Sequence, residues 1–161
     1  MPSLKSADWP IENLPGLSET DRTTLINLGF TSTFDLLRQA WSSSGKEDLS
    51  ARSGLHIQHI QKWVALSDLA RVPNVGCEYC GVLLHSGIAT LEQLSRTPAG
   101  PLHRQIARFQ VALFRSPDRI PDLGQVNIWT QQATTLHHQE KIQKSTPQTT
   151  PPIPTIQRRM R

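Results

Sequence analysis

The feature that most constrains the fold is an internal repeat, in which residues 14–37 match residues 72–94 after a shift of 58 positions. The first segment reads LPGLSETDRTTLINLGFTSTFDLL and the second VPNVGCEYCGVLLHSGIATLEQL. The matched pairs are Pro15 with Pro73, Leu17 with Val75, Leu25 with Leu83, Ile26 with Leu84, Gly29 with Gly87 and Phe30 with Ile88, and then, after a one-residue gap, Thr33 with Thr90, Phe34 with Leu91 and Leu37 with Leu94. Such self-similarity predicts a chain built from two copies of one unit.

Each copy has the pattern of a turn, a helix, a glycine stop and a second short helix. In the first copy, Ser18 is a typical N-cap, and the acidic residues that follow it suit the positive end of a helix. Gly29 and Gly87 each follow the last apolar position of a helix, where the left-handed conformation ends it. We therefore expect two helices per copy.

The segments that follow each copy show helical spacing of apolar residues. The predicted core positions are Ile57, Ile60, either Trp63 or Val64, and Leu69 after the first copy, and Leu102, Ile106, Phe109 and Leu113 after the second. No segment shows the alternation of a half-buried strand. The sequence therefore predicts an all-α fold.

Composition divides the chain into segments. We expect a flexible N-terminus over residues 1–8, a first repeat unit over 9–68 and a second over 69–125, with the serine run 42–45 as a loop. A possible short helix over 126–144 precedes a basic tail over 145–161, which is rich in Pro, Thr and Gln. Because this composition buries little apolar surface, we predict that the tail is disordered.

The net charge of +4 arises mainly outside the two predicted repeat units. Residues 124–161 carry five basic residues and one acidic residue, so the repeat units together are close to neutral. The sequence lacks an apolar run long enough to cross a membrane and a leader-like N-terminus, and it has too few cysteines for a disulfide framework. These properties predict a cytoplasmic protein without a membrane partner.

The pattern apolar-Pro-Gly-apolar-Gly, followed by a helix and then Gly-apolar-Thr, is similar to the helix-hairpin-helix motif. Paired hairpins joined by LSDLARVPNVG specifically resemble the bacterial family of unknown function DUF4332, over roughly residues 9–125. The resemblance implies a compact tandem helix-hairpin-helix domain of the SAM/HhH-like kind. It also implies that hairpin amides approach a DNA or RNA phosphate without contacting bases.

Only some positions of this motif carry the expected residue in this sequence. Gly16 matches the first glycine of the motif, whereas Ser18 stands at the second. In the second copy, Pro73-Asn74-Val75-Gly76 has asparagine at the first glycine position, and asparagine tolerates positive φ. Acidic residues follow both turns, where phosphate-binding members tend to have basic ones. We therefore expect at least one hairpin to be structural only.

A row of arginines is a further candidate for phosphate binding. Arg104, Arg108 and Arg115 have the spacing of one helix face, opposite the predicted apolar face. Such a row either follows a phosphate backbone or is simply a solvated surface. The tail arginines, Arg158, Arg159 and Arg161, either add nonspecific attraction or keep the chain soluble.

Cysteine and histidine pairs suggest metal binding at first sight. Cys77 and Cys80 have the spacing of a zinc knuckle and precede His85, but the sequence supplies neither a fourth ligand nor a second cluster. His56 and His59 also lack partners at suitable spacing. We favour buried cysteines and solvated histidines, and we expect no metal or other cofactor.

The sequence shows no catalytic motif, which leaves two non-enzymatic functions. The first is sequence-independent nucleic-acid binding through Gly16, Ser18, residues 73–76 and the arginine row. The second is a protein-interaction or scaffolding module, in which the hairpins are purely structural. In that case an exposed patch near Trp9, Trp41 or Trp129 docks the partner.

Overall fold

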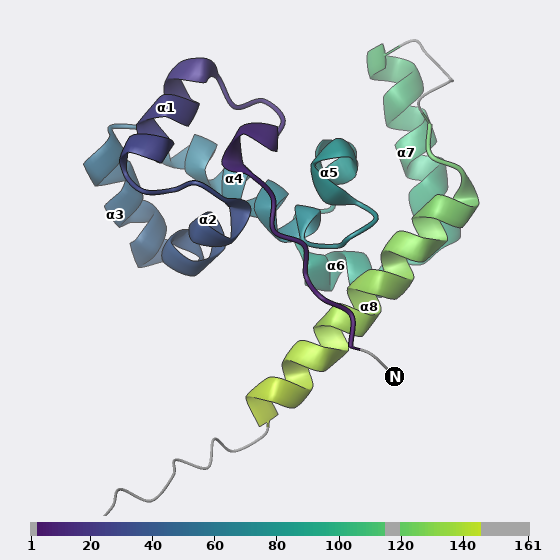
Figure 1. The fold of residues 1–161 in the computed structure, drawn as a ribbon. Helices are drawn as coiled ribbons and strands as arrows, with labels where there is room; N and C mark the ends of the chain where they lie inside the picture. Colours follow the sequence, from purple (N-terminus) through teal and green to yellow (C-terminus); the bar gives the residue numbers. More distant parts are fainter. Residues whose placement is uncertain (1–2, 115–119, 146–161) are drawn as a thin grey trace, which may run out of the picture.

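Helices are the only regular elements in residues 3–114 and 120–145, which the computed structural model describes (Figure 1). This confirms the predicted all-α class. The elements are η1 (Ile11–Asn13), α1 (Glu19–Asn27), α2 (Thr33–Ala40), α3 (Ser43–Ser53), α4 (Ile57–Ala70), α5 (Gly76–His85), α6 (Leu91–Arg96), α7 (Ala99–Phe114) and α8 (Leu123–Ser145).

The helix α4 lies at the centre of the fold. It contacts α2, α3 and α5, and its second half is buried almost continuously from Trp63 to Ala70. A helix that is apolar on most of its surface needs neighbours on several sides, and α4 has them from both copies of the repeat (Figure 1). The predicted boundary between residues 68 and 69 falls within its last turn.

The first helix of each copy ends in the same way. Gly29 and Gly87 both have φ of 93°, a conformation that side-chain-bearing residues rarely adopt. The next amide, from Phe30 or Ile88, donates back to the carbonyl of Leu25 (2.9 Å) or Leu83 (3.0 Å), which satisfies a carbonyl at the end of the helix. The glycine stops are therefore equivalent, as the repeat predicts.

The one-residue gap that we expected after these glycines is wrong. Ser32 caps α2 by accepting from the Asp35 amide, and Thr90 caps α6 by accepting from the Gln93 amide. The caps are therefore 58 positions apart, like the residues before them. The buried pairs that follow are Thr33 with Leu91 and Leu36 with Leu94. The expected gap came from pairing Thr33 with Thr90 because both are threonines. The residue equivalent to Thr90 is instead Ser32, since serine and threonine both act as N-caps.

The serine run 42–45 is not the predicted loop. Ser42 is the N-cap of α3, and its hydroxyl accepts from the Gly45 amide at 3.0 Å. Ser43, Ser44 and Gly45 form the first turn of the helix. Serine favours caps because its oxygen satisfies an amide that has no intrahelical acceptor, so this run begins a helix.

The N-terminal strap, residues 3–10, differs from the flexible N-terminus that we expected. The backbone of Leu4 exchanges two hydrogen bonds with the Gln139 side chain, at 3.0 and 2.8 Å. The Ala7 amide donates to the Arg71 carbonyl at 2.8 Å, and the Asp8 carboxylate accepts from the Phe34 amide at 3.1 Å. These partners lie far away in the sequence, so local composition gave no sign of them.

The helix α8 (Leu123–Ser145) covers the predicted range 126–144 and extends it by three residues at its start and one at its end. It contacts α6 and α7 and buries a stripe formed by Val126, Trp129, Ala133 and Leu136. In Figure 1 it runs along the side of the second copy, beyond α6. Within the described ranges, no helix combines the length and the apolar character needed to cross a membrane.

The apolar face of α7 is confirmed only in its first half. Leu102 and Ile106 are fully buried, whereas Phe109 is 42% exposed, and the side chain of Leu113 lies outside the described residues. Figure 1 shows the C-terminal end of α7 standing apart from the other helices. Helical spacing predicts which residues share a face but not how far the neighbouring helix extends along it.

Candidate functional site

The turn of the second copy, residues 72–76, uses its backbone amides within the protein. The amides of Val75 and Gly76 both donate to the Val72 carbonyl at 3.0 Å. The Asn74 amide donates to the Gln132 side chain of α8 at 2.9 Å. A phosphate would have to displace these bonds to reach the amides, so this turn is not prepared for an anion.

The side chain and carbonyl of Asn74 also attach this turn to α8. The Asn74 carbonyl accepts from Trp129 Nε1 at 3.0 Å, and its side-chain oxygen accepts from Gln132 at 3.1 Å. Asparagine in place of the motif's first glycine therefore has a structural role. Pro73, which precedes it, is half-buried, and Val75 is buried.

Gly76 is required by the approach of Trp9 from the N-terminal strap. It has φ of 55°, and a Cβ atom built on it would lie 3.0 Å from Cζ2 of the Trp9 ring. Trp9 is fixed there because its Nε1 donates to the Ala70 carbonyl at 2.8 Å. The two residues line a hollow of about 380 Å³, with Glu78 at the exposed start of α5. Gly76 thus makes room for an indole ring of the same chain.

The turn of the first copy is more open. Gly16 is exposed with φ of 76°, and Ser18 caps α1 by accepting from the Asp21 amide at 3.1 Å. Among the described residues, no acceptor is bonded to the amides of Gly16, Glu19 or Thr20. Unbonded amides at a helix N-terminus are the donors that an anion would use there.

A lysine that the sequence did not single out lies beside this turn. A Cβ atom built on Gly16 would lie 3.5 Å from the Nζ atom of Lys62, an exposed residue of α4. Opposing charges are also close, because Glu19 and Asp21 occupy the first turn of α1 and Arg22 lies 3.9 Å from Glu19. One ammonium group thus lies close to Gly16, in a turn that also holds two acidic side chains and Arg22.

The arginine row is separated from the first turn. Arg104 and Arg108 are exposed on α7, as predicted, and Arg115 lies outside the described residues. In Figure 1, α7 and α1 lie at opposite sides of the protein, with α5 between them. The predicted nucleic-acid-binding residues therefore do not form one continuous surface.

Cys77 and Cys80 are free cysteines at the start of α5. Burial raises the pKa of Cys77 to about 11 and that of Cys80 to about 12, so both remain protonated thiols at neutral pH. Within residues 3–114 and 120–145, no three His, Cys, Asp or Glu side chains are placed to hold a metal ion. His56 instead caps α4, and His59 stacks on Trp63.

Of the three tryptophans that we considered for docking, only Trp41 has a largely exposed side chain. Its exposed fraction is 55%, whereas Trp129 is buried and Trp9 is partly buried against Gly76. The expectation of an exposed patch at Trp129 is wrong because this indole lies between α8 and the turn at Asn74. Amphipathic spacing alone could not separate these cases.

Trp41 lies in a cavity of about 440 Å³ where the end of α2 faces the last turns of α8, which we call the Trp41 groove. Its apolar part is formed by Phe34, Leu37 and Trp41, and no backbone element of the described chain covers these side chains completely. The other lining residues are Ser6, Asp68, Arg71, Glu140 and Lys144.

A buried ion-pair network forms the polar wall of the Trp41 groove. Asp68 of α4 is buried and accepts from Arg71 at 2.7 Å and from the Leu91 amide at 2.8 Å. Arg71 also pairs with Glu140 of α8. Burial by itself lowers the pKa of Arg71, but its hydrogen bond to the Glu140 carboxylate and the charge of Asp68 outweigh burial and raise it. Arg71 is therefore held in place on both sides and stays charged.

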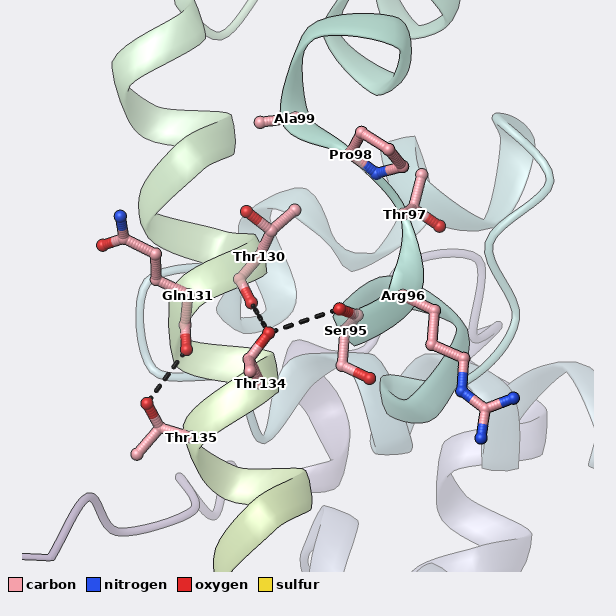
Figure 2. A pocket seen from close by; sticks show the side chains of 9 residues that line it. All are labelled: Ser95, Arg96, Thr97, Pro98, Ala99, Thr130, Gln131, Thr134 and Thr135. Atoms are coloured by element: carbon pink, nitrogen blue, oxygen red, sulfur yellow. Dashed lines mark hydrogen bonds between the residues drawn. The ribbon is translucent and has the colours of Figure 1, made fainter.

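A second hollow, of about 590 Å³, lies between α8 and the segment that joins α6 to α7 (Figure 2). Figure 2 shows that the hydroxyls of Thr134 and Thr135 are already engaged, and those of Thr97 and Thr130 donate to the carbonyls of Gln93 and Asn127. Thr134 donates to the carbonyls of Thr130 and Ser95, and Thr135 donates to that of Gln131. The hollow therefore offers a ligand few free donors, and it is best explained as a groove between packed helices.

The family model for the Domain of unknown function DUF4332 matches residues 15–136. The chain belongs to this family. The match begins at the first turn and ends at Leu136, the last residue of the buried α8 stripe. Glu140 and Lys144 of the Trp41 groove lie beyond the matched region, as does the N-terminal strap. No curated protein and no solved structure matches the chain.

Proposed function

We propose that this DUF4332 protein is a non-enzymatic binding module that docks a protein partner in the Trp41 groove. The supporting observation is the 55% exposed Trp41, next to Phe34 and Leu37, in a cavity whose polar wall is already paired. Exposed aromatic side chains are enriched in interface centres, and one such residue contributes much of a binding energy.

The pairing of the polar wall matters for this proposal. A partner that covers Arg71 does not leave its charge unpaired, because Asp68 and Glu140 already satisfy it. Burying an unpaired charge would cost about 3–5 kcal/mol. The Trp41 groove can therefore be desolvated at low cost, which suits an apolar partner segment.

The test is capture of partner proteins by the tagged full-length chain from a lysate of its source organism. We expect Trp41→Ala to weaken capture by about 30-fold or more, the factor that corresponds to about 2 kcal/mol at an interface hot spot. Ile26→Ala is the matched control, because Ile26 is also largely exposed but lies on α1. Equal capture by both variants would contradict the proposal.

A second candidate function, nucleic-acid backbone binding, is favoured by the first turn. There the amides of Gly16, Glu19 and Thr20 have no acceptor among the described residues, and the Lys62 ammonium group lies close to Gly16. We infer that both repeat copies are helix-hairpin-helix units, because they make equivalent helix-ending and capping bonds. In this function the first copy contacts phosphate and the second supports it.

This second candidate is tested by DNA and RNA binding of the full-length chain across a salt titration. Lys62→Gln should lower the salt slope by about 1, whereas Lys5→Gln, with the same change in net charge, should leave it unchanged. A loss caused instead by Arg104→Ala with Arg108→Ala would place the contact on α7. If none of these variants changes the slope, the nucleic-acid function fails. Either binding function is consistent with our expectation of a cytoplasmic protein.

A further inference from the structure

The Trp41 groove lies at the point where α8 ends. Lys144 lines the groove, Ser145 is the last residue of the helix, and residues 146–161 follow directly. These sixteen residues lie outside the described part of the chain. We propose that this C-terminal segment binds the Trp41 groove of its own chain, an inference that rests on the groove being the docking site proposed above.

The composition of the segment fits an aromatic groove. It reads TPQTTPPIPTIQRRMR, and Pro151 and Pro154 enclose Ile153 in a Pro-x-x-Pro arrangement. Proline-rich segments favour the extended polyproline conformation before binding, so they lose little entropy when they dock on aromatic side chains. Trp41 and Phe34 supply such a surface.

The charges of the groove and of the segment also agree. The charged side chains of the groove are Asp68, Arg71, Glu140 and Lys144, two of each sign. Residues 145–157 carry no charged side chain, and the arginines come only after them. A neutral proline-rich stretch therefore brings no further charge into the groove, and the ion pairs of Arg71 stay intact beneath it. A strongly charged partner segment would gain no net electrostatic attraction, because the groove carries two charges of each sign.

The covalent connection makes weak affinity sufficient. Pro151 lies six positions after Ser145, which gives a reach of about 20 Å at about 3.1 Å per residue in the polyproline conformation. A short tether gives an effective concentration of about 1 mM, so an intrinsic Kd of about 100 µM would keep roughly nine grooves in ten occupied. A separate protein partner would then have to displace the segment.

The experiment uses the full-length chain labelled with 5-fluorotryptophan and observed by ¹⁹F NMR. Resonances are assigned by individual Trp→Phe substitutions. Ile153→Asp places a charge in the segment and should shift the Trp41 resonance and raise its solvent isotope shift at least twofold. The buried Trp63 and Trp129 resonances should not move. Ile128→Asp, a matched change at an exposed position elsewhere on α8, should leave Trp41 unchanged.

The outcomes separate this inference from the proposed function. An unchanged Trp41 resonance in Ile153→Asp overturns the inference, and an effect that disappears on dilution assigns the groove to the segment of a second copy, which also overturns it. If the inference holds, Ile153→Asp should increase partner capture about tenfold, because roughly nine grooves in ten are freed. If Trp41→Ala abolishes capture while Ile153→Asp changes nothing, the docking function stands and the inference alone fails.

Discussion

Replacing Gly76 by alanine tests whether this residue serves the packing of the fold. Both turns contain a glycine with positive φ, 76° at Gly16 and 55° at Gly76. Alanine in that conformation costs about 1–2 kcal/mol, part of which is offset by about 0.4–1 kcal/mol from the less flexible unfolded chain. For Gly16→Ala we therefore expect a loss of about 1 kcal/mol, because only the flexible end of Lys62 lies nearby, at 3.5 Å.

Gly76→Ala should cost about 3 kcal/mol, because an overpacking term of about 1–3 kcal/mol is added to the backbone term. The new Cβ atom would lie 3.0 Å from the Trp9 ring, which cannot move freely while its Nε1 is bonded to Ala70. Urea unfolding, followed by far-UV circular dichroism, measures both free energies of unfolding. Gly16→Ala is thus the matched control for the backbone term.

A double-mutant cycle then identifies the contact. In a Trp9→Ala background the ring is absent, so Gly76→Ala should cost only about 1 kcal/mol, the same as Gly16→Ala. Equal costs for the two single glycine variants, or no coupling between Gly76→Ala and Trp9→Ala, would refute the argument that Trp9 requires the glycine.

Three further predictions concern charge and protonation. Arg71→Met should cost about 3–5 kcal/mol in urea unfolding because it leaves a buried carboxylate unpaired, whereas Glu140→Gln, at a more exposed partner, should cost less than about 1 kcal/mol. Burial alone would raise the pKa of Asp35, but hydrogen bonds from Thr31 and Arg38 lower it overall, so its stabilisation is complete above its ordinary pKa of 3.8 and is lost as the pH falls through the lowered value. Asp35→Asn should therefore cost about 1 kcal/mol at pH 7 and progressively less as the pH falls through the lowered pKa. Since the pKa of Cys77 is about 11, its alkylation at pH 8 should be at least tenfold slower than that of a small exposed thiol, and comparable rates would contradict this.

Local sequence signals predicted the fold well wherever the determining contacts are local. The glycine stops at Gly29 and Gly87 and the cap at Ser18 depend on bonds within a few residues, and the structure has them as predicted. The prediction of a loop at residues 42–45 was wrong because serine is common both in loops and at helix starts. Only the bond from the Gly45 amide to Ser42 distinguishes the two cases.

The Trp41 groove could be predicted only in part. The spacing of Asp68 and Arg71 at i and i+3 signals an ion pair, and Trp41 was already a docking candidate. Glu140 is 69 residues from Arg71, and nothing in the sequence brings the two together. Lys62 beside Gly16 is likewise a contact between separate elements, so helical spacing could not identify it.

The two copies of the repeat differ in how far their turns are covered, because the elements that pack on the second turn occur only once in the described chain. The N-terminal strap and α8 have no second counterpart, and both cover the turn at residues 72–76: Trp9 packs on Gly76, while Gln132 and Trp129 bond to Asn74. In the covered turn, the glycine makes room for a packed side chain, and the backbone amides are hydrogen-bonded within the protein. The uncovered turn at Gly16 keeps free amides, and the uncovered end of α2 keeps an exposed indole. Any binding function of this fold is therefore expected in the first copy, because the elements that cover the second turn do not cover the first.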